Sequence, residues 1–413
     1  RLIGVKKIVG GSVNKVGNLY SVSARIVSVE TEEVLKAVSY DHGGKLSDLL
    51  KTGMKDVALE LVGQKRVKVP SVAIIPLNNK GEKVDDFYAW GISADLISDV
   101  SGAGLIRVAS LRQIEELGDL PIEEIARNLF VRYVITGTLW KIDEVFQLSL
   151  ELYDTEESKV IWSNRWEEAW ENLPSIKGKL AENILNTLNV TTKQEVAKAP
   201  TTNPEAYEFY LKGNYRYEKR ENMEDTEIAR GLFRKAIELD DNLIKAKNSL
   251  GLTYYDTGDY DKAMEIYTST LEQAEELGDK LGVGNSLNNI GVVHAEKGDY
   301  DTALDYFERS LAIQKEIGFK VIELVTTTHL YLAYENLEKT YDIVEIHKLI
   351  TDEEEINNYL NYALYQLLED TSYLETAYNQ VQEKADNLEP DVKAKFLSYP
   401  IPKAIVEEWE KVK

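Results

Sequence analysis

Asparagine side chains recur at a fixed spacing in the second half of this 413-residue sequence. Asn248 and Asn288 stand 40 residues apart, Asn289 follows directly, and Tyr255 comes seven residues after Asn248. An amide side chain carries two donors and an acceptor, so it can satisfy the backbone groups of a bound peptide without adding charge. We therefore predict that these four residues line a groove that binds a protein or peptide partner. The alternative interpretation, that they are ordinary polar surface or cap helical hairpins, stays open.

Residues for catalysis or metal binding form no recognisable set. Cysteine is absent, which excludes thiolate ligands and cysteine nucleophiles. The four histidines, His42, His294, His329 and His347, lack a paired-ligand spacing such as HExxH. No GxxxxGK[ST] or GxSxG string occurs, and acidic pairs such as Glu115 with Glu116 lie in solvated helical patterns. The sequence predicts a protein that is not an enzyme and that has no metal site and no cofactor.

The asparagines belong to an internal repeat of 40 residues. Residues 248–254 resemble residues 288–294, and the string Gly-Asp-Tyr-Asp occurs at 258–261 and again at 298–301. Two amphipathic helical patterns in each period are typical of a solenoid of stacked hairpins, whose first helices line a concave surface. The residue set resembles tetratricopeptide repeats of the longer type. This resemblance implies binding of a protein or peptide.

Small and large residues alternate between the paired helices of each hairpin. Gly251 and Gly291 allow close approach, while Tyr267 and Phe307 of the second helices fill the space beside them. An earlier unit around residues 210–236 and a later one at 325–350 follow the pattern less closely. The apolar stripe from Tyr359 to Leu368 and a closing helix ending near Trp409 then cap the array.

The first half contains a different repeat, with an offset of 126 residues. Residues 5–13 resemble residues 131–139, and a local shift of two residues aligns residues 30–33 with residues 154–157. Each copy predicts strand, turn, strand, turn, strand and helix. The expected strands are residues 7–15, 20–29 and the segment from Val34 in the first copy, and 133–141, 145–153 and 160–166 in the second. The helices are expected at 47–61 and 175–188.

Only the second copy has a front half. There the sequence predicts strands at 72–76 and 106–109 and helices at 88–99 and 121–129, which complete an α/β module. The first copy lacks these elements, so its sheet has an exposed edge. Either residues before Arg1 complete this module, or another chain does, including a second copy in a homo-oligomer.

Three strings in residues 71–189, VAIIPL, GISADLI and IARNLFVRYVITGTL, resemble the TolB-N-terminal-like module. Residues 4–62, with VKKIVGGSV and YSVSARIVSVET, resemble the second half of a CsgG-like domain. The usual Phe and Asn after the proline are replaced by Leu77, Asn78 and Asn79, which puts a small pocket or anion site near that loop in doubt. Neither family resemblance implies catalysis. The CsgG-like resemblance implies a periplasmic or cell-envelope setting, and the TolB-like one leaves the cytoplasm as the alternative.

The predicted fold class is one and a half small α/β modules followed by an all-α solenoid. The expected domains are a CsgG-like half module at 1–66, a TolB-like module at 67–197, a linker at 198–204, tetratricopeptide-like repeats at 205–350 and a helical cap at 351–413. Within the linker, Asn203 and Pro204 are expected to cap and begin the first helix of the array.

Acidic residues concentrate in the helical half. The net charge is −23, of which −3 falls in residues 1–200 and −20 in residues 201–413. An acidic surface repels phosphate, so nucleic acid is not an expected partner, whereas a basic or neutral protein is. Solubility of a long array explains the same acidity equally well. Charged residues interrupt every apolar run, so no transmembrane segment is expected.

Three functions fit this architecture. The leading hypothesis is a non-catalytic adaptor or scaffold, in which the array binds a partner and the α/β modules mediate assembly. The first alternative is a regulatory fragment of a signalling protein whose cyclase, kinase or transcriptional output domain lies upstream. The second is a structural subunit that assembles through the incomplete first module.

Overall fold

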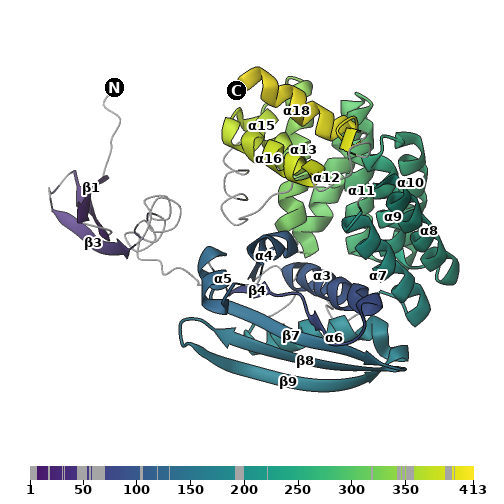
Figure 1. Ribbon diagram of the computed structural model, residues 1–413. Coiled ribbons are helices and arrows are strands. Elements are labelled where there is room, and N and C mark those ends of the chain that lie inside the picture. The colour runs from purple at the N-terminus through teal and green to yellow at the C-terminus, as the bar shows by residue number, and fades with distance from the viewer. Residues whose placement is uncertain are drawn as a thin grey trace. The chain divides into compact units, whose positions relative to one another are not determined.

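A computed structural model of the chain confirms the predicted fold class (Figure 1): mixed sheets with helices precede an all-helical array. The chain divides into two compact units, Arg1–Val69 and Pro70–Lys413. The structure describes residues 7–16, 19–29, 31, 33–43, 54, 57, 70–102, 106–118, 120–129, 131–190, 200–220, 222–317, 320–341, 346, 349, 358–386, 393, 394 and 396–413.

The first unit contains a three-stranded antiparallel sheet in the order β1-β2-β3. Its strands are β1 (Lys7–Val16), β2 (Leu19–Ser28) and β3 (Val34–Gly43). Tyr20, Val22 and Val38 form a small core together with Val57. Most of the helix expected at residues 47–61 lies outside the described residues, but Val57 is helical there.

The second α/β module has a sheet in the order β6-β4-β7-β8-β9, in which β5 also pairs with β7. Strands β4 and β6 run parallel to their neighbours, whereas β7, β8 and β9 form an antiparallel meander. Residues along β8 alternate between buried and more exposed positions, as expected for a sheet with one covered face. The elements are β4 (Ser71–Ile74), β5 (Asn78–Asn79), α3 (Asp86–Gly102), β6 (Arg107–Val108), α4 (Leu111–Leu117), α5 (Ile122–Asn128), β7 (Tyr133–Ile142), β8 (Val145–Asp154), β9 (Lys159–Ala169) and α6 (Leu173–Thr187). The sequence pattern missed β5 and α4, which are short.

The two copies share one strand register at a constant offset of 126 residues. Lys7 pairs with Ser28 in the first copy, and Tyr133 pairs with Asp154 in the second. The hydroxyl pair Ser12–Ser23, with oxygens 3.0 Å apart, returns as Thr138–Ser149 at 2.7 Å.

The predicted two-residue shift at residues 30–33 was wrong. A β-bulge interrupts the second hairpin between Ile26 and Val27, and again between Leu152 and Tyr153, at the same offset. The counterpart of Asp154 is therefore Ser28 rather than Glu30. Acidic residues are common in solvated turns, so their similarity reflected composition and not register.

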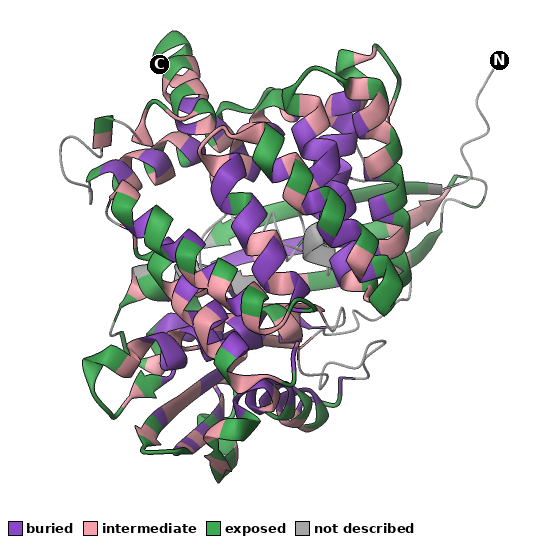
Figure 2. Cartoon of the chain, turned by 90° about the vertical axis from the view of Figure 1, so that its right-hand side faces the viewer, coloured by how far each residue is buried: buried purple, intermediate pink, exposed green. Residues whose placement is uncertain are grey.

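The array consists of helices that pack as consecutive hairpins. Asn203 caps the first of them, since its side chain accepts a hydrogen bond from the Ala206 amide at 3.1 Å, as predicted. The helices are α7 (Pro204–Glu218), α8 (Met223–Leu239), α9 (Ile244–Asp256), α10 (Tyr260–Leu277), α11 (Lys280–Glu296), α12 (Tyr300–Ile317), α13 (Lys320–Asn336), α15 (Asn358–Leu368), α16 (Thr371–Asp386) and α18 (Pro400–Val412). Buried residues follow the inner faces of these helices (Figure 2). None of the helices in the described part of the chain is both long and apolar enough to cross a membrane.

Candidate functional site

Glycines at one position of successive hairpins bring the paired helices together. A Cβ atom on Gly251 would lie 2.4 Å from the ring of Tyr267, and one on Gly291 would lie 2.7 Å from the ring of Phe307. Both distances are too short for real Cβ contacts, so only glycine fits. This confirms the packing predicted for these two pairs.

The turns between the helices also follow from the sequence. Gly258 and Gly298 both have a φ of +79°, a left-handed conformation that glycine adopts without strain. Asp259 then caps helix α10 by accepting a hydrogen bond from the Lys262 amide. Because the turns are equivalent, successive first helices stand side by side.

A cavity of about 360 Å³ lies among these first helices. Helices α9, α11 and α13 form one wall, and α15 with residues 396–402 forms the other. The wall is rich in tyrosine, including Tyr255, Tyr359 and Tyr399. Such a space is within the usual range for a site that holds a small molecule or part of a peptide.

Three of the four predicted groove residues line this cavity: Tyr255, Asn288 and Asn289. Asn288 is 7% exposed, and its Oδ1 atom accepts a hydrogen bond from the Thr326 hydroxyl at 3.0 Å. Asn289 is partly exposed beside it. Asn248 lies outside the wall, where its Oδ1 atom accepts a hydrogen bond from the Ser286 hydroxyl at 3.3 Å.

The Tyr255 hydroxyl has its own partner, since it donates to Glu296 at 3.2 Å. Tyr255 therefore offers mainly its aromatic ring to the cavity. The described part of the chain contains no cluster of His, Asp or Glu that could hold a metal ion.

His329 is a cavity residue that the sequence did not single out. Its Nδ1 atom lies 3.4 Å from Asn288 Oδ1, an acceptor, which favours the tautomer with the proton on Nδ1. Burial lowers the pKa of His329 to about 4, which keeps the ring neutral near pH 7. Its Nε2 atom is then a buried acceptor without a hydrogen-bond partner among the described residues. In the sequence, His329 stands one repeat of 40 residues after Asn289, the neighbour of Asn288.

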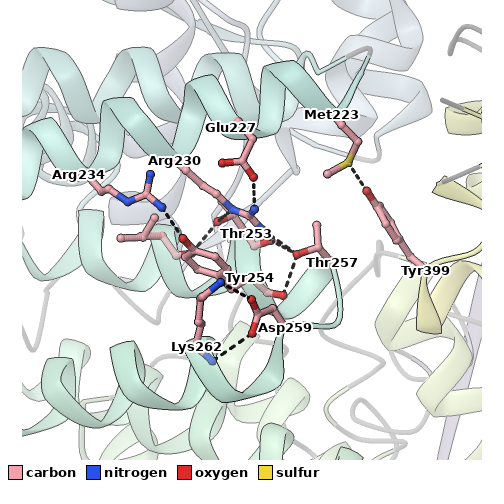
Figure 3. A network of polar contacts seen from close by, with 11 residues as sticks. Met223, Glu227, Arg230, Arg234, Thr253, Tyr254, Thr257, Asp259, Lys262 and Tyr399 are labelled. Carbon is pink, nitrogen blue, oxygen red and sulfur yellow. Dashed lines mark hydrogen bonds and ion pairs between the residues drawn. The ribbon is translucent and has the colours of Figure 1, made fainter.

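The C-terminal segment closes the cavity against the first hairpin. The Tyr399 hydroxyl donates to the sulfur of Met223 at the start of α8 (Figure 3), and Pro400 packs beside Gly258. Residues far apart in the chain thus meet across the array, and the groove is more enclosed than the predicted open surface.

A buried arginine joins helix α8 of the first hairpin to helix α9 of the next (Figure 3). Arg230 donates to the Thr253 carbonyl and to the Thr257 hydroxyl, both at 2.7 Å, and also to Glu227. Its guanidinium group lies 4.0 Å from the ring centre of Tyr254. These contacts fix the end of α9 against α8, next to Met223.

The α/β module packs directly on the array. Helix α3 contacts α7 and α13, and a Cβ atom on Gly91 would lie 2.9 Å from Leu211. At this junction Lys245 lies 3.3 Å from Asp95 and 3.5 Å from Asp99. Lys245 comes from helix α9 of the array and both carboxylates come from α3, so these ion pairs join the α/β module to the array.

A second hollow of about 390 Å³ lies beside the loop after β4. Asn78, Gly137 and Ser149 line it together with the carboxylate of Glu151. A carboxylate repels an anion, so this wall does not favour binding of an anion. This agrees with the sequence, in which Leu77, Asn78 and Asn79 depart from the TolB-like pattern and put an anion site in doubt.

Comparison with known proteins identifies the array. Residues 241–316 match the tetratricopeptide repeat family. The chain carries tetratricopeptide repeats. This confirms the predicted tetratricopeptide repeats for residues 241–316, and repeats of this class typically act in protein interaction.

A curated relative, "Putative adenylate cyclase 3" of Rhizobium meliloti (strain 1021), is 25% identical over 190 residues. The match covers 44% of this chain and 32% of the relative, so the chain spans only part of that protein's length.

Two solved structures show weaker likeness. Aspartyl phosphate phosphatase F from Bacillus subtilis is 20% identical with a TM-score of 0.36, covering 57% of this chain and 64% of that one. TolB from Acinetobacter baumannii is 15% identical with a TM-score of 0.24, covering 30% of this chain and 29% of that one. Scores this low carry no argument, so the TolB-like and CsgG-like resemblances remain predictions.

Proposed function

We propose that this chain is a non-catalytic adaptor whose array binds a peptide segment of a basic or neutral protein in the tyrosine-rich cavity. The single observation that carries the proposal is the meeting of Asn288, Asn289 and His329 in one wall of that cavity, where the His329 Nε2 atom has no hydrogen-bond partner among the described residues. Amide and imidazole groups supply the directed hydrogen bonds, and the tyrosine rings supply apolar surface. The acidity of residues 201–413 favours a partner without excess negative charge.

Peptide display on the purified chain tests the proposal. Peptides enriched on residues 1–413 are titrated against two variants, Asn289→Ala in the wall and Asn248→Ala one repeat earlier and outside it. We expect Asn289→Ala to weaken binding about tenfold, the effect of one lost hydrogen bond of about 1.4 kcal/mol, and Asn248→Ala to leave it unchanged. Equal effects of the two variants, or none from either, would reject the cavity as the binding site.

A second candidate function is supported by the match to a protein named an adenylate cyclase. In this alternative the chain is the regulatory part of a signalling protein, and the array responds to a partner while another region carries out catalysis. The natural gene product decides between the two. Formation of cyclic AMP that changes with Asn289→Ala supports the regulatory role, and a gene product without an output domain rules it out.

We also propose a periplasmic or cell-envelope location, which rests on the resemblance of residues 4–62 to CsgG-like domains. Fractionation of cells that express the natural gene product checks this. Recovery with cytoplasmic markers would contradict it.

A further inference from the structure

Helices α16 and α18 are held together by a small apolar core of their own. Leu374, Ala377, Val381 and Ile405 form this core, which is separate from the main core of the array and the α/β module. Contacts inside such a core stay buried when the two helices move as one body. The core of this helix pair therefore does not require the pair to pack on the first hairpins.

Helix α15 joins the helix pair to the array. Its residues Leu360 and Leu364 belong to the main core, and α15 packs on α13. Toward the pair, α15 packs on α16, and the Tyr365 hydroxyl donates a hydrogen bond of 3.2 Å to Glu408 of α18. One side of the pair is thus fixed to the array through α15.

The other side of the pair meets the first hairpins at Tyr399 and Pro400. The Tyr399 hydroxyl donates to the sulfur of Met223 (Figure 3), an atom that accepts hydrogen bonds weakly. Pro400 lies 3.5 Å from the position of a Cβ atom on Gly258. In the described part of the chain, α18 has no packing on α8 or α9 comparable to its packing on α16. This side is therefore held by weaker contacts than the side at α15.

The cavity of about 360 Å³ is enclosed by this arrangement, because Phe396, Ile401 and Pro402 line it together with α9 and α11. A space of this size holds a small molecule or a few side chains. An extended peptide rises about 3.3 Å per residue, so about six residues span roughly 20 Å and must leave the cavity at both ends. A peptide can therefore lie along Asn288 and Asn289 only if part of the enclosing wall moves.

We propose that α16, α18 and the turn at residues 396–399 form a lid, which moves away from α8 and α9 to admit the partner segment. This inference rests on the proposed function, since it concerns entry to the same cavity. Motion about α15 separates Tyr399 from Met223 and Pro400 from Gly258, and leaves the core of the lid intact. The closed lid competes with the partner, so the measured affinity is lower than that of the open array by the fraction of molecules that are open.

Thiol labelling measures opening of the lid without a partner. The sequence has no cysteine, so a single introduced thiol is the only one that reacts. Thr226 lines the cavity and is 3% exposed, whereas Thr270 of α10 is 0% exposed and lies outside the cavity wall. Thr226→Cys therefore reports opening of the lid, and Thr270→Cys reports unfolding of the array.

Tyr399→Ala removes the contact with Met223 and is the variant that loosens the lid. We expect it to speed labelling of Thr226→Cys at least ~10-fold and to leave labelling of Thr270→Cys unchanged. Equal acceleration at both positions would show general destabilisation and would overturn the lid. An unchanged rate at both positions would overturn it as well.

Cross-linking tests whether the partner segment needs the lid to open. Met223→Cys with Tyr399→Cys allows a short bismaleimide to join the lid to α8. The control pair, Tyr378→Cys with Trp409→Cys, joins α16 to α18 within the lid, where the native rings stack with their centres 5.3 Å apart. Binding of peptides enriched on residues 1–413 is measured for each pair before and after cross-linking. We expect the first cross-link to weaken binding at least ~10-fold and the second to leave it unchanged.

The two measurements separate this inference from the proposed function. A peptide whose binding is weakened by Asn289→Ala, but not by the cross-link between residues 223 and 399, would overturn the lid and leave the proposed function standing. Faster labelling at residue 226 alone supports the lid even where no displayed peptide binds, and that lack of binding would reject only the proposed function.

Discussion

The Tyr207 hydroxyl donates a hydrogen bond of 2.6 Å to the carboxylate of Asp95, and so joins the first helix of the array to helix α3 of the α/β module. Asp95 is 6% exposed and lies 3.9 Å from Lys177 and 3.3 Å from Lys245. Lys177 is also buried and forms an ion pair with Asp99. The junction is therefore a buried charge network in which removing one partner leaves another uncompensated.

Asp95→Ala is predicted to lower the free energy of unfolding by about 3–5 kcal/mol, because Lys177 and Tyr207 lose their shared partner inside the protein. Chemical denaturation measures the loss. The control is Asp305→Ala, whose side chain is 67% exposed and whose ion pair with Arg309 is on the surface, with an expected change under about 1 kcal/mol. Similar losses for the two variants would show that the junction does not depend on the network.

The Asp95 carboxylate also makes the free energy of unfolding depend on pH. Burial alone would raise the pKa of Asp95, but Lys245, Lys177 and the Tyr207 hydroxyl lower it below its ordinary value of 3.8. The unfolded chain then takes up the proton first, so the contribution of Asp95 is present above about pH 4 and disappears as the pH falls through the lower, folded pKa. Denaturation curves should show a smaller acid-induced loss in Asp95→Asn than in the parent.

Gly291→Ala is predicted to destabilise the array by about 1–3 kcal/mol, since the new Cβ would lie 2.7 Å from Phe307 and 3.2 Å from the Ala303 carbonyl. Gly231, in helix α8, has no atom within 4 Å of the same position. Gly231→Ala should therefore stabilise by up to about 1 kcal/mol through helix propensity alone. Thermal unfolding of both variants distinguishes the steric clash at residue 291 from the effect of replacing any helical glycine. A higher unfolding temperature for Gly291→Ala would contradict the predicted close packing against Phe307.

Local patterns explain why so much of the fold was predictable. The pairing of Gly251 with Tyr267 recurs at Gly291 with Phe307, within one hairpin each, so the sequence spacing already indicates the contact. Strand register in the first half was also visible from the 126-residue repeat, apart from the shift proposed at its acidic turn.

Contacts between modules left no such pattern. Asp95, Lys177 and Lys245 come from three helices far apart in the chain. The sequence around each residue does not predict which of the others it contacts. The closing of the cavity by Tyr399 against Met223 has the same character. Asn248 occupies the repeat position of Asn288, yet only Asn288 reaches the cavity, because the C-terminal helices enclose one part of the array.

Arg230→Met is predicted to lower the free energy of unfolding by about 2–4 kcal/mol, because it removes the hydrogen bonds to the end of α9 while keeping much of the side-chain volume. Arg309→Met is the control, since that side chain is 48% exposed with a single ion pair to Asp305. Denaturant unfolding of the two variants should differ clearly. A loss under about 1 kcal/mol for Arg230→Met would show that the network in Figure 3 adds little stability.

Because the His329 imidazole is buried in its neutral form, we expect a second contribution to the pH dependence of the free energy of unfolding. Its pKa falls from an ordinary 6.5 to about 4 because the ring is buried, so between these values the unfolded chain binds a proton that the folded chain does not. Stability contributed by the neutral ring is complete above about pH 6.5 and decreases by about 3 kcal/mol as the pH falls to 4. His329→Gln removes the titrating group and keeps a polar side chain beside Asn288. Denaturation between pH 7 and pH 4 should show a shallower loss of stability in His329→Gln than in the parent. A nitrogen NMR spectrum with the proton on Nε2 at pH 7 would contradict the assigned tautomer, and parallel pH profiles for the parent and His329→Gln would contradict the buried neutral ring.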